Sequence, residues 1–300
     1  MPIPEAYPIR EFLNYLTFQK RYSRHTIISY ENDLTGFFDF VALQYHSLAL
    51  TEISASVVRS WLASLKENKI TSKTVNRKIS TLKSFFKYQL KMNKIEVNPV
   101  SAITSLKISK RLPSFVEQKD TKTLFSYVEF PDTWEGKTNR LLLMIFYQTG
   151  VRLSELINIK ESHIDNSKGS IKVLGKGNKE RIIPVNNALL KEIETYIAEK
   201  NFNIDEAQKG LLFINIKGKK LYPKYVYNVV RKYLGDVSTN ERKSPHILRH
   251  TFATHLTNNG ADINAIKELL GHASLASTQI YTHNSIDKLK EVHKLAHPKS

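Results

Sequence analysis

Apolar residues recur at helical spacing through the N-terminal third of the chain. In one stretch, four apolar side chains follow one another at three or four positions: Ile27, Tyr30, Leu34 and Phe38. The spacing predicts three helices, over Ile9–Lys20, Ser23–Gln44 and Ser54–Glu67. A fourth, basic helix follows them. The pair Asn98-Pro99 then ends the series, because proline cannot continue a helix. We therefore expect an all-helical bundle here.

The remainder of the chain combines helical spacing with one region of strict alternation. Ile171 and Val173 occupy alternate positions, and Ile183 and Val185 repeat the pattern. Between them, Gly175–Lys179 reads Gly-Lys-Gly-Asn-Lys, a composition typical of a turn. The chain is therefore predicted to be mainly α, with one small β-hairpin in its second half.

The chain length and one polar stretch predict two domains. A chain of 300 residues is long enough for two hydrophobic cores. Residues 105–113, SLKISKRLP, are polar and basic and end in proline, as linkers often do. We place a helical domain at 1–108, the linker at 109–113 and a second domain at 114–300.

The charge narrows the class of partner. The chain has 45 Lys and Arg against 28 Asp and Glu, a net charge of +17, with 41% hydrophobic residues and no cysteine. Such a folded, basic protein suits a polyanion, either nucleic acid or an acidic membrane surface. The longest apolar run, Leu141–Tyr147, is far shorter than the roughly 20 residues that cross a bilayer, and the first residues lack a signal core. We expect a cytoplasmic protein without disulfides.

The positive charge of the first domain is concentrated in its last predicted helix. One arc of the helical wheel is apolar: Val75, Ile79, Leu82, Phe85, Phe86 and Leu90. The opposite arc is cationic and has no interspersed acid: Lys73, Arg77, Lys83, Lys87, Lys91 and Lys94. A solvated surface and a membrane-surface helix are the alternatives. We favour a helix along DNA, with Lys73, Lys83 and Lys87 on phosphates and with Asn76 and Arg77 reaching base edges.

Several cations in the second domain could bind one anion. Ser244-Pro245 begins a helix that places His246 and Arg249 on one face near its N-terminus, where anions are favoured. Arg152 follows a glycine stop, and its alternative role is an ion pair with Glu155. Lys176 lies at the hairpin tip, where the alternative is an exposed turn lysine. The flanking glycines lack the spacing of a nucleotide-binding loop, so ATP binding is not expected.

His272 and Tyr281 extend the set of candidates. His272 directly follows the predicted helix stop at Gly271, and Tyr281 comes nine residues later. Metal binding is disfavoured, because the helix that carries His246, His250 and His255 has no carboxylate, and metal-dependent phosphodiester chemistry needs clustered carboxylates. Neither a metal nor a cofactor is expected.

Four segments together resemble the successive active-site motifs of the tyrosine recombinases. They are Thr149–Leu156 (TGVRLSEL), Gly175–Arg181 (GKGNKER), His246–Leu256 (HILRHTFATHL) and Leu270–His283 (LGHASLASTQIYTH). Their order and spacing match that family, and the likeness is greatest to its Xer branch, which resolves chromosome dimers. The N-terminal pattern also fits that branch, at Ser23, Thr26, Tyr30, Asp33 and Leu34. The resemblance covers nearly the whole chain.

The resemblance implies a mechanism with covalent catalysis. Tyr281 would attack a DNA phosphodiester and form a 3′-phosphotyrosyl intermediate. Arg152 and Arg249 would bind the non-bridging oxygens, and Lys176 would protonate the leaving 5′ oxygen. His246 would position or deprotonate Tyr281, His272 would donate a further hydrogen bond, and Glu155 would orient Arg152 or His246.

The resemblance also implies an architecture and partners. A SAM-like helical core-binding bundle and a mostly helical catalytic domain would close on double-stranded DNA as a C-shaped clamp. Homo- or hetero-tetramers with a related recombinase would form on the DNA, with a DNA translocase as a further candidate partner. The tail Ile286–Leu295 would dock on a neighbouring protomer, and packing on its own domain is the alternative. Small departures after the linker and after Tyr281 keep an integrase of a mobile element as an alternative. A non-catalytic DNA-binding regulator and a type IB topoisomerase-like enzyme are the others.

Overall fold

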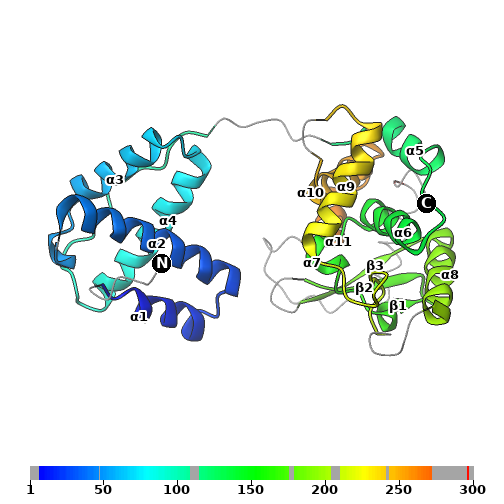
Figure 1. Ribbon diagram of the computed structural model, residues 1–300, viewed down its shortest axis with the longest axis horizontal. Coiled ribbons are helices and arrows are strands. Elements are labelled where there is room, and N and C mark those ends of the chain that lie inside the picture. The colour runs from blue at the N-terminus through cyan, green and yellow to red at the C-terminus, as the bar shows by residue number, and fades with distance from the viewer. Residues whose placement is uncertain are drawn as a thin grey trace. The chain divides into compact units, whose positions relative to one another are not determined.

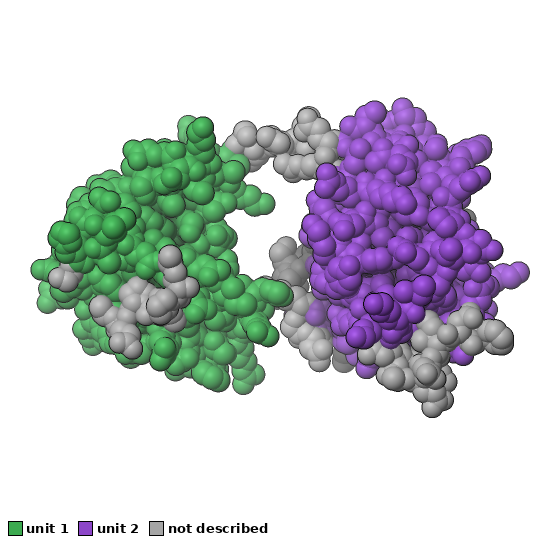
Figure 2. All heavy atoms as spheres, viewed as in Figure 1, with its two compact units in different colours: residues 1–111 green, residues 112–300 purple. Residues whose placement is uncertain are grey.

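A computed structural model describes most of the chain and divides it into two compact units. The described residues are 7–46, 48–108, 115–175, 179–203, 210–240, 243–271 and 296. The division falls between unit 1, Met1–Arg111, and unit 2, Leu112–Ser300 (Figure 2). Each unit encloses a hydrophobic core of its own. The predicted linker 109–113 lies outside the described residues.

Unit 1 is helical throughout its described part, as the apolar spacing predicts. Its helices are α1 (Ile9–Asn14), which continues as a π-helical turn (Tyr15–Gln19), α2 (Arg24–Tyr45), α3 (Ala55–Glu67) and α4 (Ser72–Lys91) (Figure 1). A short 3-10 turn, Leu50–Glu52, precedes α3. Side-chain caps stabilise the N-termini of the two long helices, α2 and α4. The Ser23 hydroxyl accepts a hydrogen bond from the Thr26 amide, and the Thr71 hydroxyl accepts one from the Thr74 amide. The four predicted helices are confirmed.

Aromatic rings fill the core between α2 and α4. Phe38 and Phe85 meet edge to face with centroids 5.5 Å apart, and Phe37 meets Phe86 in the same way at 6.2 Å. One position of the predicted apolar arc is wrong: Leu90 is 39% exposed, and Gln89 is buried in its place. The helical spacing explains this difference. Leu82, Phe86 and Gln89 are separated by four and then three positions and so share the buried face, whereas Leu90 continues the exposed series of Lys83 and Lys87.

Unit 2 surrounds a small sheet with helices. Its helices are α5 (Gln118–Ser126), α6 (Trp134–Thr149), α7 (Leu153–Leu156), α8 (Asn187–Asn203), α9 (Pro223–Val237), α10 (Pro245–Asn258) and α11 (Ile263–Leu270), with a 3-10 turn at Glu161–His163. The sheet is antiparallel in the order β1-β2-β3, over Ile164–Asp165, Ser170–Leu174 and Glu180–Pro184 (Figure 1). The predicted hairpin is confirmed as β2 and β3. The mainly α fold with a small sheet is thus confirmed.

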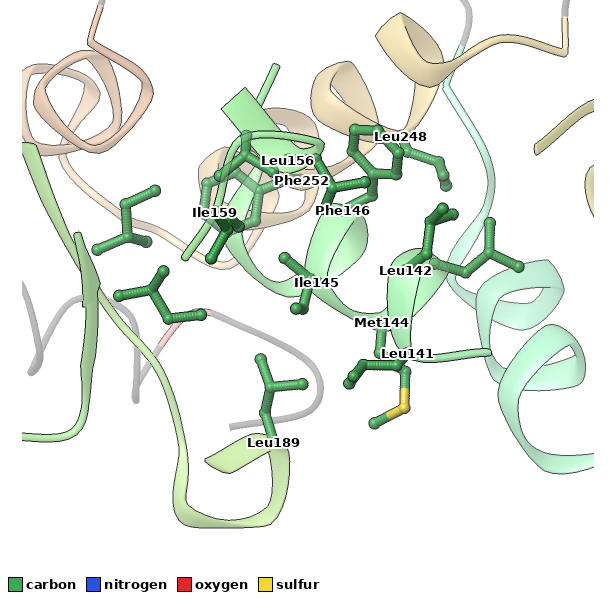
Figure 3. Close-up of a cluster of buried hydrophobic side chains, with 14 of the residues drawn as sticks. Leu141, Leu142, Met144, Ile145, Phe146, Leu156, Ile159, Leu189, Leu248 and Phe252 are labelled. Atoms are coloured by element: carbon green, nitrogen blue, oxygen red, sulfur yellow. The ribbon is translucent and has the colours of Figure 1, made fainter. Parts of the chain in front are cut away.

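Helix α6 is the centre of unit 2. It carries the longest apolar run of the sequence, and its side chains from Leu141 to Thr149 are all buried. Figure 3 shows Ile145 and Phe146 of this helix among side chains of neighbouring elements, including Leu156 and Phe252. A helix that is apolar on every side needs such enclosure. No helix in the described ranges is both long enough and apolar enough to span a membrane.

The way α6 ends determines where Arg152 lies. Gly150 closes the helix with a left-handed φ of 60°, a conformation that glycine adopts readily. A Cβ at Gly150 would lie 2.5 Å from Cδ1 of Phe252, so α10 leaves no room for any other residue there. The chain then turns at once into α7, with Arg152 at its N-cap.

Candidate active site

Half of the six predicted catalytic residues lie in the described part of the chain: Arg152, His246 and Arg249. Glu155, predicted to orient one of them, is described as well. Lys176, His272 and Tyr281 lie outside the described residues. The geometry below is therefore that of the arginines and their partners.

Glu155 ties Arg152 to the start of α7. Its Oε2 accepts a hydrogen bond from the backbone N–H of Arg152 at 2.7 Å, as expected for an acid three positions after an N-cap. Its Oε1 accepts a second bond from Nη1 of Arg152 at 2.8 Å. The predicted ion pair is thus present, and it fixes both the backbone and the side chain of Arg152.

A third charged residue, Arg181 on β3, completes the environment of Glu155. Nη1 and Nη2 of Arg181 donate to Oε1 and Oε2 of Glu155, both at 2.8 Å. This bidentate geometry is the strongest that a guanidinium makes with a carboxylate. Arg181 and Glu155 are 5% and 2% exposed at their side chains, whereas Arg152 is 31% exposed. Of Arg152, Glu155 and Arg181, only Arg152 has a side chain that is accessible to solvent.

The charge state of Glu155 follows from these partners. Burial by itself raises the pKa of a carboxyl, but the hydrogen bonds and charge of Arg181, together with those of Arg152, lower the pKa of Glu155 to about 2. Glu155 is therefore ionised at neutral pH, as a buried carboxylate with four donors should be.

Arg249 enters the same region from α10. Its Nη1 donates to the carbonyl of Gly150 and its Nη2 to that of Leu270, both at 2.6 Å. Burial lowers the pKa of Arg249 to about 10, and the positive charges of Arg152 and Arg181 act in the same direction. Arg249 is therefore still charged at neutral pH, in a place where an anion would relieve the repulsion between the three guanidinium groups.

The three arginines converge on the C-terminal turn of α11. Nε of Arg181 donates to the carbonyl of Leu269 at 2.8 Å, Nη2 of Arg249 to Leu270, and Nη2 of Arg152 to Gly271 at 3.0 Å. The last carbonyls of a helix have no intrahelical partner and carry partial negative charge. Three consecutive carbonyls are thus each bound by a different arginine, and segments far apart in the sequence meet at one turn.

Two of the undescribed candidates follow glycines that touch this network. Gly271, which precedes His272 in the sequence, accepts the bond from Arg152. Gly175, which precedes Lys176, is so close that a Cβ there would lie 3.5 Å from Oε1 of Glu155 and 3.7 Å from Nη1 of Arg181. The sequence neighbours of both predicted residues therefore belong to the arginine network.

His246 stands apart from Arg249 in burial. Pro245 begins α10 as predicted, and His246 in the first turn is exposed, whereas Arg249 is 7% exposed. The predicted common face thus has a buried arginine and an accessible imidazole.

Arg181 is not among the predicted site residues, although the sequence carries a signal for it. Arg181, Ile183 and Val185 occupy alternate positions, so Arg181 shares the inward face of the return strand with two apolar residues. A charged side chain on such a face needs a buried partner. The structure supplies Glu155.

On α4, the candidate DNA-binding residues divide into two groups. Lys73, Lys83 and Lys87 are exposed. Asn76 instead binds the backbone of Leu106 at both ends of its amide: Nδ2 donates to the carbonyl at 2.9 Å and Oδ1 accepts from the N–H at 2.7 Å.

Arg77 is held by α2 while remaining half exposed. Nη1 of Arg77 donates to Oδ2 of Asp33 at 2.5 Å and to the hydroxyl of Ser29 at 2.6 Å. Lys78 and Thr81 also donate to the buried Asp33 carboxylate, at 3.0 and 2.9 Å. Asp33 therefore joins α2 to α4 and orients Arg77 and Lys78 of α4.

The described residues contain no group of three or more His, Cys, Asp or Glu side chains that could hold a metal ion. Glu155, the carboxylate of the arginine network, has all its hydrogen bonds from arginine. Its charge is thus already matched by guanidinium groups.

Family models match both units. Residues 114–287 match the phage integrase family, and residues 9–93 match the phage integrase N-terminal SAM-like domain. Among curated relatives, the tyrosine recombinase XerC of Thermodesulfovibrio yellowstonii is 38% identical over 301 residues, which cover 97% of this chain and 96% of that protein. The XerC of Staphylococcus aureus is 38% identical over 292 residues, 96% of each chain.

Solved structures share the fold at lower identity. The XerH site-specific recombinase, in a post-cleavage complex with a palindromic difH substrate, aligns with a TM-score of 0.70 at 24% identity, over 96% of this chain and 84% of that one. The Tn1549 transposon integrase, in complex with transposon right end DNA, aligns at 0.71 with 18% identity, over 96% and 99%. With family models over both units and relatives 38% identical over almost the whole length, this chain belongs to the phage integrase family and is a tyrosine recombinase of the Xer type.

Proposed function

We propose that this tyrosine recombinase cleaves DNA by attack of Tyr281 on a phosphodiester at its recombination site. The Tyr281 oxygen forms a bond to phosphorus, the bond from phosphorus to the 5′ oxygen breaks, and a 3′-phosphotyrosyl linkage and a free 5′-hydroxyl result. Attack by a 5′-hydroxyl of the partner strand reverses these steps and restores the backbone, with no net hydrolysis. The observation that supports this most is the convergence of Arg152 and Arg249 at one turn.

The electrostatics of that turn suit a phosphodiester. In the described part of unit 2, three guanidinium groups surround the single carboxylate of Glu155. Negative charge builds on the non-bridging oxygens as the nucleophile attacks, and fixed cations stabilise it without reorganising. Arg152, the most exposed of the three, would meet the phosphate first, and Arg249 would supply a second planar donor.

Three further residues would transfer protons or donate hydrogen bonds. Lys176 follows Gly175 at the network and would donate a proton to the leaving 5′ oxygen. His246, exposed at the start of α10, would take the proton of Tyr281 or position its hydroxyl, and His272 would donate a hydrogen bond to the phosphate. The arginine charge would fill the role that a metal ion has in other phosphodiester chemistry.

Unit 1 would hold the DNA backbone. Exposed Lys73, Lys83 and Lys87 lie along one face of α4, and Arg77 is anchored beside them. A row of lysines without interspersed acids fits successive phosphates. In a complex with DNA, Arg77 and Asn76 would reach bases only if their bonds to Asp33 and Leu106 opened.

The cellular role that we propose is resolution of chromosome dimers in the cytoplasm. The relatives named XerC support this assignment, since they match nearly the full length of the chain. Two strands must be exchanged in each of two duplexes, so a tetramer on DNA is expected, built from this chain alone or together with a related recombinase. The segment Ile286–Leu295 would join neighbouring protomers, and a DNA translocase would act on the assembly.

A nicked suicide duplex tests the chemistry. Footprinting on genomic fragments first identifies the bound sequence, and the duplex then carries that sequence with a nick that lets the 5′-hydroxyl fragment diffuse away. We expect a covalent protein–DNA adduct that resists denaturation, and none with Tyr281→Phe. A wild-type protein that binds this duplex without an adduct, or a Phe variant that still forms one, contradicts the proposal. Relaxation of supercoils without exchange between two sites would indicate a topoisomerase instead.

A further inference from the structure

Arg181 is the most deeply buried arginine of the network, and it contacts two parts of the site at once. Its terminal nitrogens bind both oxygens of Glu155, and its Nε binds the carbonyl of Leu269. It therefore connects the residue that holds Arg152 to the end of the helix from which the chain leads to His272.

We propose that Arg181 is a positioning residue, which sets the orientation of the Arg152 guanidinium through Glu155 and fixes the end of α11. This inference rests on the proposed function, because it assigns Arg152 to the phosphate. Arg181 itself is 5% exposed and faces inward from β3, so it acts on the reaction only through its partners.

The hydrogen bonds of Glu155 leave it no freedom. Oε1 accepts from Nη1 of Arg152 and Nη1 of Arg181, and Oε2 accepts from the Arg152 backbone and Nη2 of Arg181. A carboxylate has about four lone-pair positions, and all are used. Without Arg181 two of them are vacant, and the carboxyl can rotate away from the geometry that places Nη1 of Arg152.

The glycine after α11 shows how closely Arg181 is fitted. Gly271 has a left-handed φ of 62°, and a Cβ on it would lie 3.1 Å from Cδ and 3.3 Å from Nη1 of Arg181. The guanidinium therefore lies directly against the backbone of the turn that Arg152 and Arg249 bind. A lysine in its place has one donor group and cannot reach Glu155 and Leu269 with the same fork.

Single-turnover adduct formation on the suicide duplex tests this assignment. At saturating protein, Arg181→Lys should form the adduct roughly 10- to 100-fold more slowly, the loss expected for a small misplacement of a catalytic group. The Kd for the same duplex should change by less than about threefold, because the defect belongs to the transition state. Arg140→Met is the matched control: it breaks an arginine–carboxylate pair with Glu192 elsewhere in unit 2 and should cleave at the wild-type rate.

A double variant shows whether Arg181 acts through Glu155. Arg181→Met leaves the buried Glu155 carboxylate with only its two bonds from Arg152 and risks unfolding, whereas Arg181→Met with Glu155→Gln also removes that negative charge. If Arg181 orients Arg152 through Glu155, the losses of the two single variants should not multiply: the double variant should be slower than Glu155→Gln alone only by what the lost bond to Leu269 contributes. Losses that multiply in the double variant would overturn the proposal.

A neutral substrate separates positioning from general structural damage. In a methylphosphonate duplex, a methyl group replaces one non-bridging oxygen at the scissile phosphorus, so less charge develops for Arg152 to stabilise. The defect of Arg181→Lys should shrink on this substrate. An equal defect on both duplexes would mean that Arg181 is only structural.

The remaining outcomes are distinguishable. If wild type and Arg140→Met form no adduct, the proposed function fails. If they do and the Arg181 variants match them, only this inference fails. If even the neutral double variant does not fold, as judged by circular dichroism, Arg181 is a folding residue and the inference is wrong.

Discussion

At the scale of single residues, charge is fixed by hydrogen bonding more than by burial. Glu155 is almost fully enclosed, a position that disfavours ionisation, yet its donors lower its pKa to about 2. Arg249 keeps its charge with a pKa of about 10 despite burial and two neighbouring arginines. In the proposed function, this excess of positive charge attracts the scissile phosphate.

The pKa of Glu155 predicts a pH dependence of stability. Its folded pKa is lower than its unfolded value of about 4.3, so the stabilisation is complete above that value and is lost as pH falls towards 2. Between about pH 5 and pH 2, wild type should lose on the order of 3 kcal/mol more unfolding free energy than Glu155→Gln. Urea unfolding at several pH values measures the unfolding free energy of both proteins and thus the difference between them. Glu192→Gln is the control and should follow wild type, and parallel curves for Glu155→Gln would contradict the prediction.

Gly150 offers a second residue-scale prediction. Alanine there would need a left-handed φ and would place its Cβ 2.5 Å from Phe252. We expect Gly150→Ala to cost roughly 2 to 4 kcal/mol of unfolding free energy, from backbone strain and overpacking together. Gly235→Ala on α9, where nothing lies within 4 Å, should be neutral or slightly stabilising. Denaturant unfolding compares them, and equal effects would refute the packing argument.

At the scale of elements, α4 has one face in the core and another that carries exposed lysines. The buried face packs through Phe85 and Phe86, and Asp33 on α2 binds three side chains of α4. Those bonds fix the rotation of α4 about its axis. The exposed lysines therefore point in a direction that the core determines.

The cationic face predicts a salt dependence. Lys87→Glu should weaken DNA binding and reduce the magnitude of the slope of log K against log salt by about 1, since each neutralised phosphate releases counterions. Lys168→Glu makes the same charge change at a lysine that pairs with Asp165 and serves as the control. Fluorescence anisotropy over a range of salt measures both slopes. An unchanged slope in Lys87→Glu, or the same change in both variants, would exclude this face from the phosphate contacts.

At the scale of the whole molecule, each unit has its own core, and each unit hydrogen-bonds the residues next to the segment that connects the two units. Asn76 binds the backbone of Leu106 in unit 1. In unit 2, Asn240 donates to the carbonyl of Phe115 at 2.8 Å, and the amide of Val116 donates to Thr251 at 2.9 Å. Each unit thus has what a domain needs to fold separately.

We predict that residues 1–108 alone fold and bind DNA without reacting. The fragment keeps the core of unit 1, the anchored Leu106 and the lysines of α4, but it lacks every candidate catalytic residue. A cooperative thermal transition and salt-dependent binding without adduct are expected. The same fragment with Asn76→Ala, which frees Leu106, should melt earlier. A non-cooperative transition in the parent fragment would show that unit 1 depends on unit 2.

Most of the elements and the kind of chemistry could be predicted from the sequence. Helices and the β2–β3 hairpin follow from local periodicity, which needs no knowledge of distant residues. The motifs around Arg152, His246 and Arg249 indicated an anion site and the recombinase family. Strand β1 has only two residues, too few for any period to be visible.

Which of these residues meet depends on the packing of the folded chain. Arg181 became part of the site because its strand faces Glu155, and Asn76 and Arg77 acquired partners on segments far away in sequence. Periodicity reports which face of an element is buried, whereas pairing between elements depends on packing, and the arginine network is made of such pairs.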